Sequence, residues 1–164
     1  MSVYRVVVIL GSEHDYASVA PIKSILGRFG ISYDVRVASA HRDAERLAAM
    51  IEEYERRDET IVYITVAGLS NALSGFVDFR TKHPVIACPP HSDMLWQVDI
   101  FSSLRMPKGV APLVICDPEN AALAAVKILG ESDARLADRI QEYRKELQLK
   151  SEKADQKVKT MQSG

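Results

Sequence analysis

Five short apolar runs, separated by stretches with helical spacing, constrain the fold of this chain more than any other feature. They cover residues 4–10, 33–37, 60–66, 84–88 and 112–116. Between most of them, apolar residues recur at intervals of three and four, which is typical of amphipathic helices. Strands that alternate with helices in this way predict a parallel sheet covered by helices on both faces.

The expected helices cover residues 19–29, 44–54, a segment that ends near 80, 120–129, and a last stretch that opens near 132. We therefore predict a flavodoxin-like three-layer α/β/α sandwich with an extra C-terminal helix. Its five-stranded parallel sheet is expected to have the order 2-1-3-4-5. Residues 1–150 form one predicted domain that includes this helix, and the polar segment 151–164 is expected to fray.

Composition and cysteine usage exclude several classes of protein. A net charge of −1 gives no electrostatic support for nucleic-acid binding, and no apolar stretch approaches the roughly 20 residues of a membrane span. Cys88 and Cys116 each end an apolar run, so both are expected to be buried free thiols. Without a disulfide framework, and with no space for a signal peptide before the first strand, a reducing cytoplasm is the expected location. The four histidines are scattered, so no metal site is predicted.

Polar side chains follow the first three apolar runs. In open parallel sheets, ligands bind beyond the carboxyl ends of the strands, next to the first strand, where the strand order reverses. The polar side chains expected at this edge are Ser12, Asp15, Ser39, His41, Arg42, Ser70 and Asn71. Residues 88–93 (CPPHSD) form a stiff loop on the same rim that could cover a ligand.

The segment 39–42 (SAHR) carries the chemistry that is easiest to interpret. His41 is a candidate proton carrier, because an imidazole titrates near neutral pH. Arg42 offers a planar fork suited to phosphate, and Ser39 lies beside it. The structural alternatives are a histidine bonded at a strand end and a solvated arginine at a helix start.

The loops after the first and third strands allow the same two interpretations. Ser12 and neighbouring amide groups could contact an anion while Asp15 accepts ribose hydroxyls, or Ser12 and Asp15 could cap the following helix. Small residues from Gly68 to Gly75, including Ser70 and Asn71, could contact a flat ligand or allow close helix packing.

Several other chemistries lack their sequence patterns. Neither GxGxxG nor a GxxxxGK motif followed by Ser or Thr occurs, which argues against dinucleotides and nucleoside triphosphates. No GxSxG elbow is present for a serine hydrolase, and Cys88 fits a small core residue better than a nucleophile. The third strand runs into Val66-Ala67-Gly68, which supplies no carboxylate as a phosphoacceptor.

Six motifs together resemble the phosphoribosylaminoimidazole carboxylase family of purine biosynthesis. They are GSEHD (11–15), SAHR (39–42), AGLSNALSGFVD (67–78), PVIACPP (84–90), SSLRMPKG (102–109) and PENAALAA (118–125). The resemblance implies the same flavodoxin-like fold, a homo-octamer, and chemistry without a cofactor. It also implies nucleotide binding at Ser12, Asp15 and Arg42, with Ser39 beside them, and proton transfer by His41.

The family has two classes. One carboxylates aminoimidazole ribonucleotide with CO2, and the other moves a carboxylate from the nitrogen of the carbamate isomer to ring carbon 4. The second usually carries a GGAAHLPG-type segment, and the corresponding AGLSNALSG of this chain lacks that histidine. The sequence thus resembles the direct class, although Arg42, Leu69 and His14 stand where lysine, arginine and serine are common. The carbamate mutase and a non-catalytic nucleotide-binding module remain the alternatives.

Overall fold

A computed structural model describes residues 4–91 and 96–162 and contains one five-stranded parallel sheet. The strand order is β2-β1-β3-β4-β5, which confirms the prediction from the sequence. The strands are β1 (Tyr4–Leu10), β2 (Ser32–Val37), β3 (Thr60–Val66), β4 (Val85–Ala87) and β5 (Leu113–Val114). Because β1 lies between β2 and β3, the loops that follow these three strands leave the sheet side by side.

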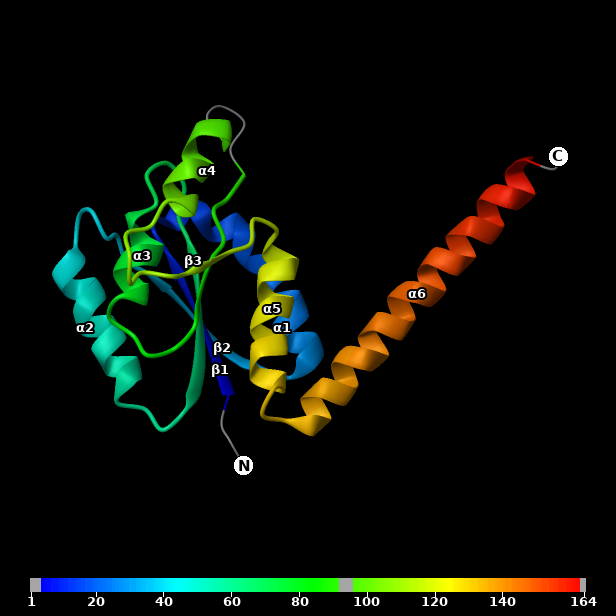
Figure 1. The fold of residues 1–164 in the computed structure, drawn as a ribbon, viewed down its shortest axis with the longest axis horizontal. Helices are drawn as coiled ribbons and strands as arrows, with labels where there is room; N and C mark the ends of the chain where they lie inside the picture. Colours follow the sequence, from blue (N-terminus) through cyan, green and yellow to red (C-terminus); the bar gives the residue numbers. More distant parts are fainter. Residues whose placement is uncertain (1–3, 92–95, 163–164) are drawn as a thin grey trace.

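Helices cover both faces of the sheet, as Figure 1 shows. On one face lie α1 (Val19–Phe29) and α5 (Pro118–Gly130), and on the other α2 (Ala44–Glu55) and α3 (Ala72–Asp78). A 3₁₀ helix, η1 (Glu13–Ser18), precedes α1. The three layers confirm the flavodoxin-like sandwich expected from the alternation of runs.

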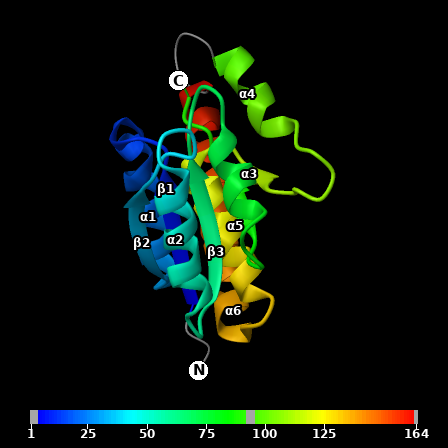
Figure 2. The same cartoon turned by 90° about the vertical axis from the view of Figure 1, so that its left-hand side faces the viewer.

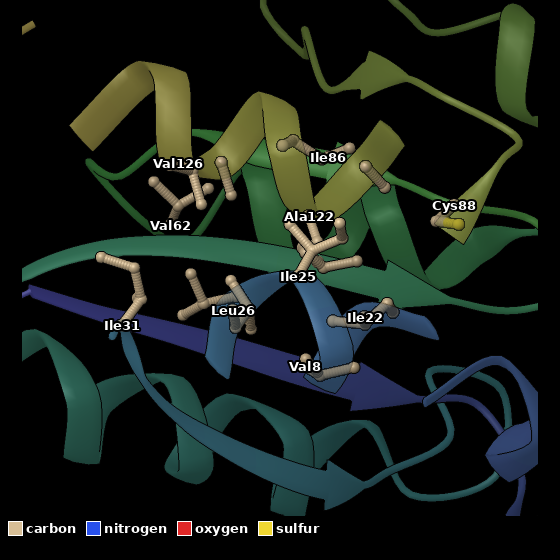
Figure 3. Close-up of a cluster of buried hydrophobic side chains, with 14 of the residues drawn as sticks. Val8, Ile22, Ile25, Leu26, Ile31, Val62, Ile86, Cys88, Ala122 and Val126 are labelled. Atoms are coloured by element: carbon tan, nitrogen blue, oxygen red, sulfur yellow. The ribbon is translucent and has the colours of Figure 1, made fainter. Parts of the chain in front are cut away.

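The central strand β1 is buried on both faces. Val6, Val8 and Leu10 pack in the layer that contains α1 and α5, whereas Val7 and Ile9 pack toward α2. Figure 3 shows the first layer, where strand and helix side chains meet, among them Val8, Ile22, Leu26, Val62 and Ala122. This double burial explains why a run without polar alternation forms a strand here.

One helix was not predicted. Helix α4 (Trp96–Leu104) lies beyond the upper end of α3 in Figure 2, past the carboxyl edge of the sheet. Its apolar residues Val98, Phe101 and Leu104 are exposed, so they give no stripe that faces the core. A search for helices that turn one apolar face toward the core therefore misses α4.

The structure differs from two expectations about the C-terminal half. Cys88 is buried, but Cys116 is exposed, because it lies beyond the two-residue strand β5 at the edge of the sheet. Residues 151–162, which belong to the segment expected to fray, continue helix α6 (Ala134–Gln162). Residues 151–162 contain good helix formers and an ion pair between Asp155 and Lys159, with 2.6 Å between the charged atoms.

Helix α6 is attached to the rest of the molecule by its own N-terminal end and extends away from it, as Figure 1 shows. Only Leu136 and Ile140 of this helix are buried, and both join the core beside α5. Within residues 4–91 and 96–162, no helix is long and apolar enough to cross a membrane.

Candidate active site

A cavity of about 570 Å³ lies at the carboxyl edge of the sheet. The loops after β1, β2 and β3 supply its walls: Gly11, Ser12, His14, Asp15, Ser39, Ala40, His41, Arg42, Ala67, Gly68, Leu69, Ser70 and Leu73. Its volume falls within the range of pockets that hold small ligands. The structure thus brings together seven of the eight predicted site residues, and the exception is Asn71.

The loop after β1 forms a capping box. The Ser12 hydroxyl accepts the backbone N–H of His14 at 3.3 Å, and the Asp15 carboxylate accepts the backbone N–H of Ser12 at 3.0 Å. Both residues therefore cap η1 and line the cavity at the same time. Because these two amide groups already have partners, an anion at this wall needs donors from side chains.

Asp15 is half-buried at the base of this loop. Burial raises the pKa of its carboxyl above the ordinary value, and the hydrogen bond from Ser12 opposes this shift. Gly11 keeps the loop close to the third strand: a Cβ at this position would lie 3.1 Å from the Ala67 side chain. The Gly11 N–H also donates to the carbonyl of Val66 at 2.8 Å, so the loops after β1 and β3 share one wall.

The loop after β2 presents His41 and Arg42 from one tight turn. The Ser39 hydroxyl lies 3.3 Å from the backbone nitrogen of Arg42 and 3.5 Å from its Nε, so Ser39 orients this arginine. Asp43 ends the turn by capping α2, where its carboxylate accepts the N–H of Arg46 at 3.3 Å. These bonds fix the backbone on both sides of the turn.

The His41 ring is exposed and lines the cavity. Across residues 4–91 and 96–162, no hydrogen bond is formed with its ring nitrogens. The alternative of a structural histidine bonded at the strand end is therefore not realised. An imidazole without structural bonds is free to exchange a proton with a ligand.

The loop after β3 is held from outside by α4. Leu69 has a φ of 57°, in the left-handed region that a side chain rarely adopts, and its carbonyl lies 3.2 Å from the Ser102 hydroxyl. The same hydroxyl accepts the backbone N–H of Asn71 at 2.9 Å. Helix α4 thus pins a strained turn at the rim of the cavity.

The prediction that Asn71 contacts the ligand is not supported by its position. Its side chain is 4% exposed, does not line the cavity, and bonds to the Ser103 hydroxyl at 2.9 Å. Its carbonyl oxygen accepts the N–H of Ser74 at 3.2 Å and so caps α3. Asparagine is a preferred helix cap, and this role uses the polar atoms that a ligand would need.

The sequence did not single out His14 as a site residue. Its place between Ser12 and Asp15 nevertheless puts it on the same wall of the cavity. Of the predicted rim loop, Ser92 and Asp93 lie outside the described residues, while Pro90 lies against Gly68, where a Cβ would be 3.4 Å away. Among the described residues, no group of three His, Cys, Asp or Glu side chains could hold a metal ion.

The sequence is similar to known proteins over nearly its whole length. The model of a family described as AIR carboxylase matches residues 5–150. A phosphoribosylaminoimidazole carboxylase of Treponema denticola is 45% identical over 154 residues, which cover 94% of this chain and 97% of that protein. An N5-carboxyaminoimidazole ribonucleotide mutase of Methanocaldococcus jannaschii is 38% identical over 156 residues, with 94% and 97% covered.

The fold of this chain is also similar to a solved structure. The crystal structure of Treponema denticola PurE matches it with a TM-score of 0.91 and 44% identity, over 94% of this chain and 98% of that chain. The similar proteins carry the names of both a carboxylase and a mutase, so likeness alone does not separate these two reactions.

Proposed function

Because this chain belongs to the AIR carboxylase family, we propose that it carboxylates 5-aminoimidazole ribonucleotide directly with CO2 in purine biosynthesis. The observation that carries this proposal is the turn after β2. It presents an imidazole without structural bonds and a guanidinium to one cavity, next to the hydroxyls of Ser12 and Ser39. A proton acceptor beside an anion site is what carboxylation of a phosphorylated ring requires.

The proposed binding mode assigns each part of the ribonucleotide to residues that line the cavity. The 5′-phosphate lies on Arg42, which the Ser39 hydroxyl orients, and Asp15 accepts the ribose hydroxyls. The ring then faces His41 across a space that the small side chain of Ala40 and Gly68 leave open. Gly68 and Ser70 complete the contact with the flat ring. Holding the reactants in this way supplies several kcal/mol of the barrier.

The proposed reaction forms one carbon–carbon bond and breaks one carbon–hydrogen bond. Carbon 4 of the amino-substituted imidazole is enamine-like and attacks the carbon of CO2, whose displaced electron pair becomes a carboxylate. The adduct keeps a hydrogen on carbon 4. Neutral His41 removes it as a proton, and the electron pair left behind restores the aromatic ring.

CO2 carries no charge, so the cavity must hold it by exclusion of water. We propose that residues 68–75 and 88–95 enclose it, with residues 92–95 outside the part of the chain that the structure describes. Leu69 and Leu73 already give this wall an apolar character. No cofactor is needed in this scheme, because the ring itself supplies the nucleophile.

The mutase reaction is the main alternative, since one relative bears that name. The absence of a histidine from the segment AGLSNALSG favours the direct reaction. One assay separates the two. Purified protein is supplied either with aminoimidazole ribonucleotide and bicarbonate or with the carbamate isomer, and the carbon-carboxylated product is followed. Turnover of the first substrate alone supports the proposal, and turnover of the isomer alone contradicts it. Binding without either reaction would indicate the non-catalytic module.

We further propose that the chain assembles as a homo-octamer. Support comes from apolar side chains that a monomer leaves exposed, above all Val98, Phe101 and Leu104 on α4 and Leu147 on α6. Light scattering should then give a mass of about eight times 18.2 kDa. Phe101→Asp should shift the protein to smaller species, because it would place a charge where the proposed assembly buries an aromatic ring. A monomeric wild type would contradict the proposal.

A further inference from the structure

The cavity contains a second imidazole that the proposed mechanism does not use. Nδ1 of His14 lies 2.9 Å from the hydroxyl oxygen of Ser12, which also accepts the backbone N–H of His14 at 3.3 Å. Over the described residues, no hydrogen bond reaches Nε2 of this ring. His14 is therefore coupled to Ser12, a proposed contact of the ribonucleotide, and keeps one nitrogen free.

The fixed charges of the cavity do not balance the proposed substrate. Among its lining residues, Arg42 brings one positive charge and Asp15 one negative charge. A phosphate monoester carries close to two negative charges at neutral pH. His41 must be neutral to accept the proton from carbon 4. His14 is then the remaining group on these walls that can supply positive charge.

The direction of the hydrogen bond with Ser12 depends on whether Nδ1 of His14 carries a proton. A hydroxyl has one proton to donate. When His14 is neutral with its proton on Nε2, the Ser12 hydroxyl donates to Nδ1 and has no proton left for a ligand. When Nδ1 carries a proton, in the other neutral tautomer or in the imidazolium, it donates to Ser12, and the hydroxyl proton can turn toward an anion. Of these three states, the imidazolium alone combines the free donor with a positive charge.

We propose that His14 takes up a proton from solvent when the ribonucleotide binds and, as an imidazolium, turns the Ser12 hydroxyl toward the 5′-phosphate. This inference rests on the proposed function, because it assumes a phosphorylated substrate. The charged and titratable groups around the site are Asp15 on η1 and His41 and Arg42 on the turn after β2. Asp15 attracts the imidazolium electrostatically, Arg42 opposes it, and the loop 67–70 contributes no titratable side chain.

Calorimetry of aminoimidazole ribonucleotide binding without bicarbonate tests this proposal. Titrations at pH 7.5 in two buffers with different ionisation enthalpies give the number of protons taken up. The wild type should take up a fraction of one proton, and its affinity should fall as the pH rises from 7 to 8.5, by up to about fivefold. The phosphate itself is already almost fully dianionic over this range. The nucleoside without phosphate should bind with no proton uptake.

Two variants assign the proton to its residue. His14→Gln keeps a group that can bond to Ser12 but cannot carry charge, so its affinity should not depend on pH and its proton uptake should vanish. His41→Asn should keep the uptake of the wild type. The proposal is overturned if His14→Gln takes up as many protons as the wild type, or if the nucleoside does so too. A wild type that does not bind the ribonucleotide would instead refute the substrate of the proposed function, and this inference with it.

Discussion

Replacing His41 with asparagine should abolish carboxylation and leave binding of aminoimidazole ribonucleotide within about twofold of the wild type. General acid–base catalysis contributes about 10²–10⁴-fold to a rate, and in the proposed mechanism no other step restores the aromatic ring. The described residues form no hydrogen bond with this ring, and the side chain is exposed. The substitution should therefore leave the fold and the phosphate contact intact.

The two quantities are measured separately. Product formation gives the turnover number, and calorimetry without bicarbonate gives the dissociation constant. Glu45→Gln is a suitable control, because Glu45 is exposed in the first turn of α2 and does not line the cavity. It should retain normal turnover. Near-normal activity of His41→Asn would remove His41 from the mechanism.

Replacing Arg42 with glutamine should weaken binding of the ribonucleotide by about 10- to 100-fold, with a smaller effect on turnover at saturation. Hydrogen bonds to charged groups contribute about 1.5–3 kcal/mol, and a loss of this size appears in KM when ground state and transition state share it. Arg42→Lys should recover part of the affinity, because lysine keeps the charge but loses the planar fork.

Arg46→Gln provides a matched control for this prediction. Arg46 is also an exposed arginine at the start of α2, but its Nε lies 2.7 Å from the Asp43 carboxylate and it does not line the cavity. Its loss should leave KM nearly unchanged. The nucleoside without phosphate should bind equally to the wild type and to Arg42→Gln. A loss of nucleoside affinity in Arg42→Gln would place this arginine on another part of the substrate.

Together the two substitutions separate the proposed role of His41 in proton transfer from the proposed role of Arg42 in phosphate binding. His41 is expected to act on the turnover number and Arg42 on KM, although the two residues are neighbours in one turn. The Ser39 hydroxyl orients Arg42 and makes no bond to the His41 ring, so the two effects should be largely independent.

The sheet and its order could be predicted because β1 and β3 are buried on both faces. Burial on both faces favours apolar residues at most positions, so the runs 4–10 and 60–66 can be recognised as strands from the sequence alone. The position of the site followed from the same topology, since ligands bind where the strand order reverses. Ser12, Asp15, Ser39, His41 and Arg42 line one cavity for this reason.

The features that could not be predicted from the sequence depend on contacts between segments that are distant in the chain. In the sequence, Asn71 looks like a ligand contact, because it is a polar residue in a loop that follows a strand. Only the hydrogen bond to Ser103, which is distant in the sequence, shows that its amide is used inside the protein. In helix α4, Val98, Phe101 and Leu104 are exposed, so these residues do not form the apolar face toward the core by which a helix is usually recognised. Whether Cys116 is buried depends on the length of β5, which ends after two residues.

In the proposed reaction, the new carboxylate carbon comes from dissolved CO2. A labelling experiment tests this origin most directly. Purified protein is given unlabelled aminoimidazole ribonucleotide in a medium with carbon-13 CO2, and in a second reaction it is given the unlabelled carbamate isomer in the same medium. The carbon-13 spectrum of each product is then recorded. We predict labelled product from the ribonucleotide and no unlabelled product formed by transfer within the isomer. Unlabelled product from the isomer, with none from the ribonucleotide, would show that the chain is a mutase and would contradict the proposed reaction.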